Sequence, residues 1–129
     1  MEKAIICVDD ERSILAALQL QMMREYANDY ILEFAESGEE AFELCEDFIA
    51  RSIPIALVLT DQMMPGIKGH ELIAKLAELS PKTTCILLTG YADSEIINSI
   101  TGSNLAKCLA KPWDNQELFD TIAKALKGQ

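Results

Sequence analysis

The sequence of 129 residues lacks several features that mark common classes of protein. No apolar run approaches the ~20 residues that a membrane-spanning helix needs, and Glu2 with the acids after Val8 interrupts any signal-peptide pattern. Lys and Arg total 11 against 21 Asp and Glu, and they form no basic run. Direct binding to nucleic acid or to an anionic membrane is therefore not expected. These absences together predict a cytoplasmic protein.

Closely spaced cysteine and histidine ligands are also missing. Cys7, Cys45, Cys85 and Cys108 are far apart and form no C-x-x-C pair, which excludes the usual metal-site and redox spacings. We expect reduced and mostly buried thiols. His70 is the single histidine. It stands at the predicted start of a helix and is expected at the surface, without the helical-bundle context of a phosphorelay histidine.

Short apolar runs alternate with stretches in which apolar residues recur at helical spacing. Buried strands are predicted at 4–8, 55–59, 85–88 and 105–110, and the more amphipathic run at 31–35 predicts an edge strand. Helices are predicted around five sets of apolar residues: Leu15 and Leu18, Ala41 and Phe48, Leu72 and Leu76, Ile96 and Ile100, and Leu118 and Ile122. Ser37 and Asp114 stand where two of these helices would be capped.

Five strand and helix alternations predict an α/β fold, a doubly wound parallel sheet of five strands with five flanking helices. The turn after the first strand is Asp9-Asp10-Glu11, which lacks the glycines that a dinucleotide-binding sheet requires there. The flavodoxin-like strand order 2-1-3-4-5 is therefore predicted. The length suits a single domain over residues 1–129.

In that order the first and third strands are neighbours, and their carboxyl ends carry Asp9, Asp10 and Asp61. Three converging carboxylates favour a hard cation, and Mg²⁺ prefers carboxylates, waters and phosphoryl oxygens. The fourth and fifth strands bring the Thr89 hydroxyl and the Lys111 ammonium to the same edge. This set predicts phosphoryl transfer, with Asp61 as the nucleophile.

The motifs at the strand ends resemble those of two-component response-regulator receiver domains, which are CheY-like proteins. The matching stretches are Val8–Glu11, Thr60–Gly66 with Gly69, Leu88–Tyr91 and Lys111-Pro112. They occur in order along essentially the whole chain, at the spacing of the family. The structural alternative, acids that merely form solvated turns, does not account for all of them together.

The resemblance implies a role for each residue of the set. Asp61 would accept a phosphoryl group from a sensor histidine kinase or a phosphotransfer protein. Asp10 and Asp61 would bind Mg²⁺ directly, Asp9 through water, and Met63 through its main-chain carbonyl. The chain would catalyse only its own phosphorylation and slow self-dephosphorylation, without being an enzyme otherwise. The response would reach a C-terminal output domain or a downstream protein, and a phosphorylation-dependent dimer is a further option.

The switch departs from the family pattern at one residue. Thr89 resembles the switch hydroxyl, and Lys111 resembles the amine that contacts the phosphoryl group. The family usually has Tyr or Phe at the position of Cys108, so the usual threonine–aromatic relay is in doubt, and Tyr91 is proposed as a substitute. Met63 and Tyr91 would also flank the path of the hydrolytic water, which predicts slow dephosphorylation. A cis peptide is expected between Lys111 and Pro112.

Two other classes of function remain open. One is a Mg²⁺-dependent phosphohydrolase with an Asp nucleophile, which usually has a second acid two residues after the nucleophile and a substrate cap. Met63 occupies that position here, and the chain has no length to spare for a cap. The other is a phosphorylation-independent interaction domain, which the complete set of acids, Thr89 and Lys111 disfavours. The sequence does not identify the kinase, the signal or the output.

Overall fold

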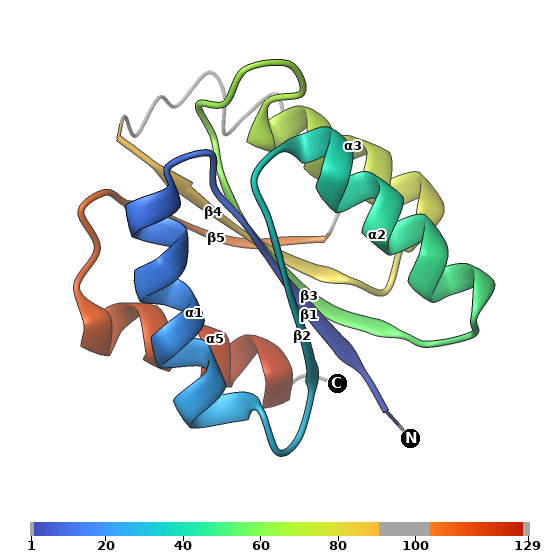
Figure 1. Ribbon diagram of the computed structural model, residues 1–129, viewed down its shortest axis with the longest axis horizontal. Coiled ribbons are helices and arrows are strands. Elements are labelled where there is room, and N and C mark those ends of the chain that lie inside the picture. The colour runs from blue at the N-terminus through green and yellow to red at the C-terminus, as the bar shows by residue number, and fades with distance from the viewer. Residues whose placement is uncertain (1, 91–103, 128–129) are drawn as a thin grey trace.

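The computed structural model describes residues 2–90 and 104–127, which form a sheet flanked by helices (Figure 1). The strands are β1 (Ala4–Val8), β2 (Ile31–Ala35), β3 (Ile55–Asp61), β4 (Thr84–Thr89) and β5 (Leu105–Ala110). The helices are α1 (Arg12–Tyr26), α2 (Gly38–Ala50), α3 (Gly69–Leu79) and α5 (Asn115–Lys127). The predicted helix that contains Ile96 and Ile100 lies outside the described residues.

The five strands are all parallel and lie in the order β2-β1-β3-β4-β5, which confirms the predicted topology. The amphipathic strand β2 lies at one edge of the sheet, also as predicted. The central strands β1 and β3 are hydrogen-bonded neighbours, with Val8 opposite Thr60. Residues that follow these two strands therefore emerge together at the carboxyl edge of the sheet.

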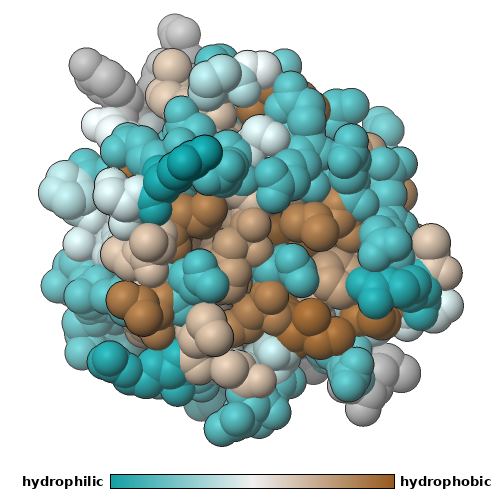
Figure 2. All heavy atoms as spheres, viewed as in Figure 1, coloured by the Kyte–Doolittle hydropathy of each residue, from teal (hydrophilic) through white to brown (hydrophobic). Residues whose placement is uncertain are grey.

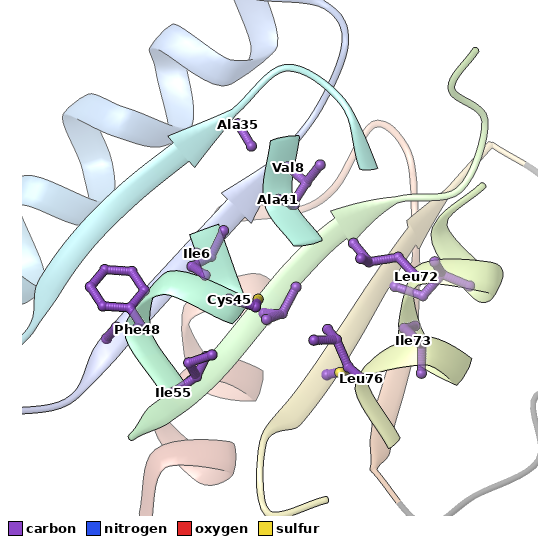
Figure 3. Close-up of a cluster of buried hydrophobic side chains, with 14 of the residues drawn as sticks. Ile6, Val8, Ala35, Ala41, Cys45, Phe48, Ile55, Leu72, Ile73 and Leu76 are labelled. Carbon is purple, nitrogen blue, oxygen red and sulfur yellow. The ribbon is translucent and has the colours of Figure 1, made fainter. Parts of the chain in front are cut away.

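Helices cover both faces of the sheet, α1 and α5 on one and α2 and α3 on the other (Figure 1). Neighbouring side chains of each strand point to opposite faces, because the side-chain period of a strand is two. Ile5 and Cys7 pack against α1 and α5, whereas Ile6 and Val8 belong to the core cluster beneath α2 and α3, which Figure 3 shows. Burial on both faces explains why the central strands are continuous apolar runs in the sequence.

Side chains cap two of the helices at the residues that the sequence predicts. The Oγ of Ser37 accepts a hydrogen bond of 3.1 Å from the backbone N–H of Glu40 at the start of α2. The Oδ2 of Asp114 accepts one of 3.0 Å from the backbone N–H of Glu117 at the start of α5. Each bond satisfies a backbone donor that has no partner within the helix.

The four cysteines are free thiols, and all but Cys108, which is half-buried, lie in the core. Burial raises the pKa of Cys7, Cys45 and Cys85 to about 12 in each case. These thiols therefore stay protonated near neutral pH, and the thiolate that would react or bind a metal does not form. The expectation that the thiols are mostly buried is confirmed.

The surface along the edge strand β2 is apolar. Figure 2 shows apolar side chains across the middle of the face seen in Figure 1, where β2 runs between α1 and α2, with hydrophilic residues around them. Most residues of β2 are half-buried, as befits an edge strand. Within residues 2–90 and 104–127, no helix has both the length and the hydropathy needed to cross a membrane.

Candidate functional site

Three aspartates meet at the carboxyl edge of the sheet. Asp9 and Asp10 directly follow β1, and Asp61 is the last residue of β3. One carboxylate oxygen from each aspartate lies within 4.8 Å of the other two. Asp9 is 0% exposed and Asp61 is 4% exposed, whereas Asp10 lies at the surface. Negative charges this close repel one another, and burial weakens the screening by water.

Lys111, which follows β5, brings one ammonium group to this acidic cluster. Its Nζ lies 2.9 Å from Oδ2 of Asp9 and 3.2 Å from Oδ1 of Asp61. No other Lys or Arg in the described part of the chain forms an ion pair with the three aspartates. One ammonium among three carboxylates leaves two negative charges uncompensated. That deficit matches the charge of a divalent cation, and oxygen ligands suit a hard one.

The surroundings shift the pKa values of Asp61 and Lys111. Burial raises the pKa of Asp61 above its ordinary value, and the charge of Asp9 raises it further, against opposing contributions from Lys111 and from the backbone N–H of Gln62. Burial alone would lower the pKa of Lys111, but its hydrogen bonds and charge interactions with Asp9 and Asp61 raise it overall. Asp61 is therefore a carboxylate of increased basicity held beside a fixed cation. That pairing favours nucleophilic attack on an electron-poor phosphorus.

Backbone hydrogen bonds fix the positions of the two buried carboxylates. The Oδ1 of Asp9 accepts a hydrogen bond of 2.9 Å from the backbone N–H of Glu11, immediately before α1. The residue after Asp61, Gln62, donates its backbone N–H to the Leu88 carbonyl of β4 at 2.8 Å. The sheet ladder thus extends one residue past Asp61 and sets the direction of its side chain.

Glycine allows α3 to begin directly against the Asp61 backbone. A Cβ added at Gly69 would lie 2.3 Å from the carbonyl oxygen of Asp61 and 2.7 Å from Cδ1 of Leu87. Gly66, earlier in the same connection, has a φ of +78°, which other residues rarely adopt. These two glycines thus allow the turn from β3 into α3.

No motif or spacing in the sequence predicts the role of Gln62. This side chain is 2% exposed, and its Oε1 accepts a hydrogen bond of 2.8 Å from the backbone N–H of His70. Its Nε2 lies 2.6 Å from Nδ1 of the same histidine. His70 is therefore half-buried and bonded at the start of α3, where the sequence predicts a surface residue. The pair ties α3 to the residue that follows Asp61.

The family model of the response regulator receiver domain matches residues 5–123 of the chain. The chain belongs to this family. The receiver is a signalling domain of two-component response regulators, not a dedicated enzyme, and the resemblance seen in the sequence is confirmed. The family typically binds Mg²⁺ in an acidic pocket. The described residues include an acidic cluster of this kind, formed by Asp9, Asp10 and Asp61.

Individual relatives of this receiver agree with the family model. The hydrogenase transcriptional regulatory protein HoxA of Cupriavidus necator is 29% identical over 99% of this chain and 25% of its own length. The response regulator receiver protein CpdR of Brucella abortus is 27% identical over 96% of this chain and 97% of its own.

Among solved structures, the signal receiver domain of an HD domain-containing protein from Pseudomonas fluorescens Pf-5 superimposes with a TM-score of 0.84. It is 32% identical to this receiver, over 99% of this chain and 97% of that one. By contrast, the receiver spans only 25%, 32% and 53% of the length of three of its curated relatives. Those longer proteins contain further chain beyond the matched segment.

Thr89, Met63 and Cys108, which the sequence predicts to act in switching or gating, are among the described residues. Thr89 ends β4 and is 5% exposed, and its carbonyl accepts a hydrogen bond of 2.9 Å from the Lys111 backbone N–H. Met63 is 59% exposed, and Cys108 of β5 packs on the core beneath α2 and α3. The peptide bond between Lys111 and Pro112 is cis, as predicted. Tyr91 lies outside the described residues.

Proposed function

We propose that Asp61 is the residue of this receiver that accepts a phosphoryl group, from the phosphohistidine of a sensor kinase or of a phosphotransfer protein. The observation that carries this proposal is the ammonium of Lys111 held between Asp9 and Asp61, 2.9 and 3.2 Å from their oxygens. A buried Asp61 with a raised pKa supplies the nucleophile. Lys111 supplies a positive charge on the side from which a phosphoryl group would approach.

Each group has a defined part in the transfer. A carboxylate oxygen of Asp61 attacks phosphorus in line with the leaving nitrogen of the phosphohistidine, and the imidazole departs with the electron pair of the broken P–N bond. Lys111 exchanges its contact with Asp61 for one with a phosphoryl oxygen while it remains bonded to Asp9. The hydroxyl of Thr89 donates a hydrogen bond to the new phosphoryl group.

The donor set of the acidic cluster fits Mg²⁺. Asp10 and Asp61 would bind the ion directly, Asp9 through water and Met63 through its main-chain carbonyl. The ion would supply charge neutralisation for the carboxylate and phosphoryl oxygens. The two negative charges that Lys111 leaves uncompensated support this assignment.

The phosphohydrolase alternative fits these residues less well. Such an enzyme needs an acid near its Asp nucleophile to protonate the leaving group. The residue two positions after Asp61 is Met63, whose side chain is exposed and cannot transfer a proton. The ion-paired Lys111 likewise argues against a phosphorylation-independent interaction domain. Partial burial of several charges lowers the stability of the fold, and such a domain would have no chemical need for them.

We further propose that residues 1–129 form one receiver domain that acts in the cytoplasm. Its phosphorylation would control an output domain or a downstream protein, directly or through a phosphorylation-dependent dimer. The net charge of −10 disfavours direct contact with nucleic acid or anionic membranes. The transcriptional regulators among its relatives support control of gene expression through another domain. The phosphorylated receiver would hydrolyse only its own aspartyl phosphate.

Intact-protein mass spectrometry tests the assignment of Asp61. Acetyl phosphate with Mg²⁺ is expected to add one phosphoryl group to the wild-type chain and none to Asp61→Asn, and chelation of Mg²⁺ is expected to prevent the addition. Asp29→Asn removes an exposed carboxylate outside the acidic cluster and is expected to behave as the wild type does. Continued modification of the Asp61→Asn variant would remove Asp61 from the acceptor role.

A further inference from the structure

A large open pocket of about 760 Å³ continues from the acidic cluster along the side of α1. Asp61, Lys111, Met63 and Gly90 line it at the carboxyl edge of the sheet. No atom of the described residues lies within 4 Å of a Cβ added at Gly90. As far as these residues define it, the pocket is open where a phosphodonor would meet Asp61.

The rest of the pocket is a groove between α1 and the segment that follows β5. Ser13, Ala17 and Gln21 line the α1 side at intervals of four residues, so they lie on one face of the helix. With a rise of 1.5 Å per residue, this face extends about 12 Å along the helix from Ser13. The groove is long enough for a group the size of an aromatic ring beyond the phosphorus.

The walls of the groove are largely apolar, and one of them is held in place. Ile14 contributes from α1, and Pro112 and Trp113 contribute from the segment after β5. The indole Nε1–H of Trp113 donates a hydrogen bond of 3.0 Å to Oδ1 of Asn115, and the ring packs on the core cluster beneath α1 and α5. A preformed planar wall favours binding of a flat apolar group over a small polar one.

We propose that this groove binds the leaving group of the phosphodonor, and that the receiver therefore favours donors with a planar aromatic leaving group over donors with a small one. The proposal rests on the phospho-acceptor role of Asp61, because the same pocket contains Asp61 and Lys111 at one end. In-line attack directs the leaving group away from the Asp61 oxygen. Continuity of the groove with the reacting carboxylate is the reason to assign it to the donor.

Two acyl phosphates test this preference with the same bond chemistry. In both, an Asp61 oxygen forms a bond to phosphorus while the bond from phosphorus to the acyl oxygen breaks, and the leaving group departs as acetate or benzoate. The two leaving carboxylates have similar basicity, so the ring is the main difference. A phenyl group in the groove buries roughly 60 Å² more apolar surface than a methyl group, which corresponds to about a tenfold larger second-order rate constant for benzoyl phosphate.

Matched substitutions on α1 assign the preference to the groove. Ala17 lines the groove, whereas its exposed neighbour Ala16 does not, so Ala17→Phe fills the space and Ala16→Phe adds the same ring outside it. Ala17→Phe is expected to lower the ratio of benzoyl to acetyl phosphate rate constants several-fold, and Ala16→Phe to keep the wild-type ratio. Trp113→Ala removes the opposite wall and is also expected to lower the ratio. It provides a second measurement if Ala17→Phe does not fold.

The outcomes separate this proposal from the phospho-acceptor role. Equal rate constants for the two donors, with phosphorylation still dependent on Asp61, would overturn the leaving-group proposal alone. A preference for benzoyl phosphate that both groove variants retain would also overturn it, because the ring would then bind elsewhere. Failure of both donors to phosphorylate the wild-type chain would contradict the role of Asp61 and this inference with it.

Discussion

Substitution of Lys111 by methionine removes the cation of the acidic cluster while it keeps the length of the side chain. Asp9, which is 0% exposed, and Asp61 then face each other without a positive charge. Loss of one partner from a buried ion pair costs about 3–5 kcal/mol. The cluster faces an open pocket, and this exposure reduces the cost. We therefore expect the free energy of unfolding to fall by about 2–4 kcal/mol without Mg²⁺.

The pH dependence of this loss follows from the pKa shifts. The raised pKa of Lys111 means that its stabilising effect is complete at neutral pH and disappears only as the pH rises through the alkaline range. In Lys111→Met, protonation of a carboxylate relieves the repulsion. The difference from the wild type should therefore be largest near neutral pH and shrink as the pH falls through the raised pKa of Asp61.

Urea unfolding followed by circular dichroism in a chelating buffer measures this difference. Lys107→Met is the matched control, because Lys107 is an exposed lysine of β5, the strand that Lys111 follows. Its loss is expected to change the free energy of unfolding by less than about 0.5 kcal/mol. Addition of Mg²⁺ should restore part of the stability of Lys111→Met. A variant as stable as the wild type at neutral pH, or a loss that is independent of pH, would refute the account of the cluster.

Three further predictions concern Asp61, Gly69 and Met63. Asp61→Asn is expected to raise the free energy of unfolding by about 1 kcal/mol near neutral pH without Mg²⁺. The raised pKa means that ionised Asp61 opposes folding, so the gain should vanish as the pH falls through that pKa, and a less stable variant in urea unfolding would contradict this. Gly69→Ala should lower the free energy of unfolding by at least about 2 kcal/mol in the same assay, because its Cβ would lie 2.3 Å from the Asp61 carbonyl oxygen. A variant as stable as the wild type would speak against this contact. Met63→Asn should speed loss of the phosphoryl group several-fold, because an amide can orient the attacking water. Met23→Asn changes another exposed methionine and should leave the rate unchanged. Equal decay rates for the two variants would rule out gating by Met63.

The strand order and the acidic cluster were predictable because they depend on features that are local in the sequence. Each buried strand is a short apolar run that ends at a charged or hydroxyl residue, and parallel topology places all such ends at one edge. Asp9 and Lys111 are 102 positions apart, yet the expected strand order brings both to the site. The sequence thus predicts which residues meet. It does not predict that the ammonium of Lys111 contacts Asp9 as well as Asp61.

Other features depend on loop shape, which leaves no periodic signal. The bonds between Gln62 and His70 form because the connection from β3 to α3 folds back on itself, and no spacing rule predicts a buried amide there. The groove beside α1 also escapes sequence reasoning. Its apolar residues have the spacing of an ordinary helix face, and only the position of Trp113 opposite them creates the space.

Reduction of the phosphorylated protein with borohydride tests the central claim most directly. Borohydride converts an aspartyl phosphate to homoserine and leaves free carboxylates unchanged, so peptide mass spectrometry identifies the acceptor residue. After treatment with acetyl phosphate and Mg²⁺, homoserine is expected at position 61 and at no other aspartate. Homoserine in place of Asp9 or Asp10, or none in a protein that still gains a phosphoryl group, would contradict the assignment of Asp61.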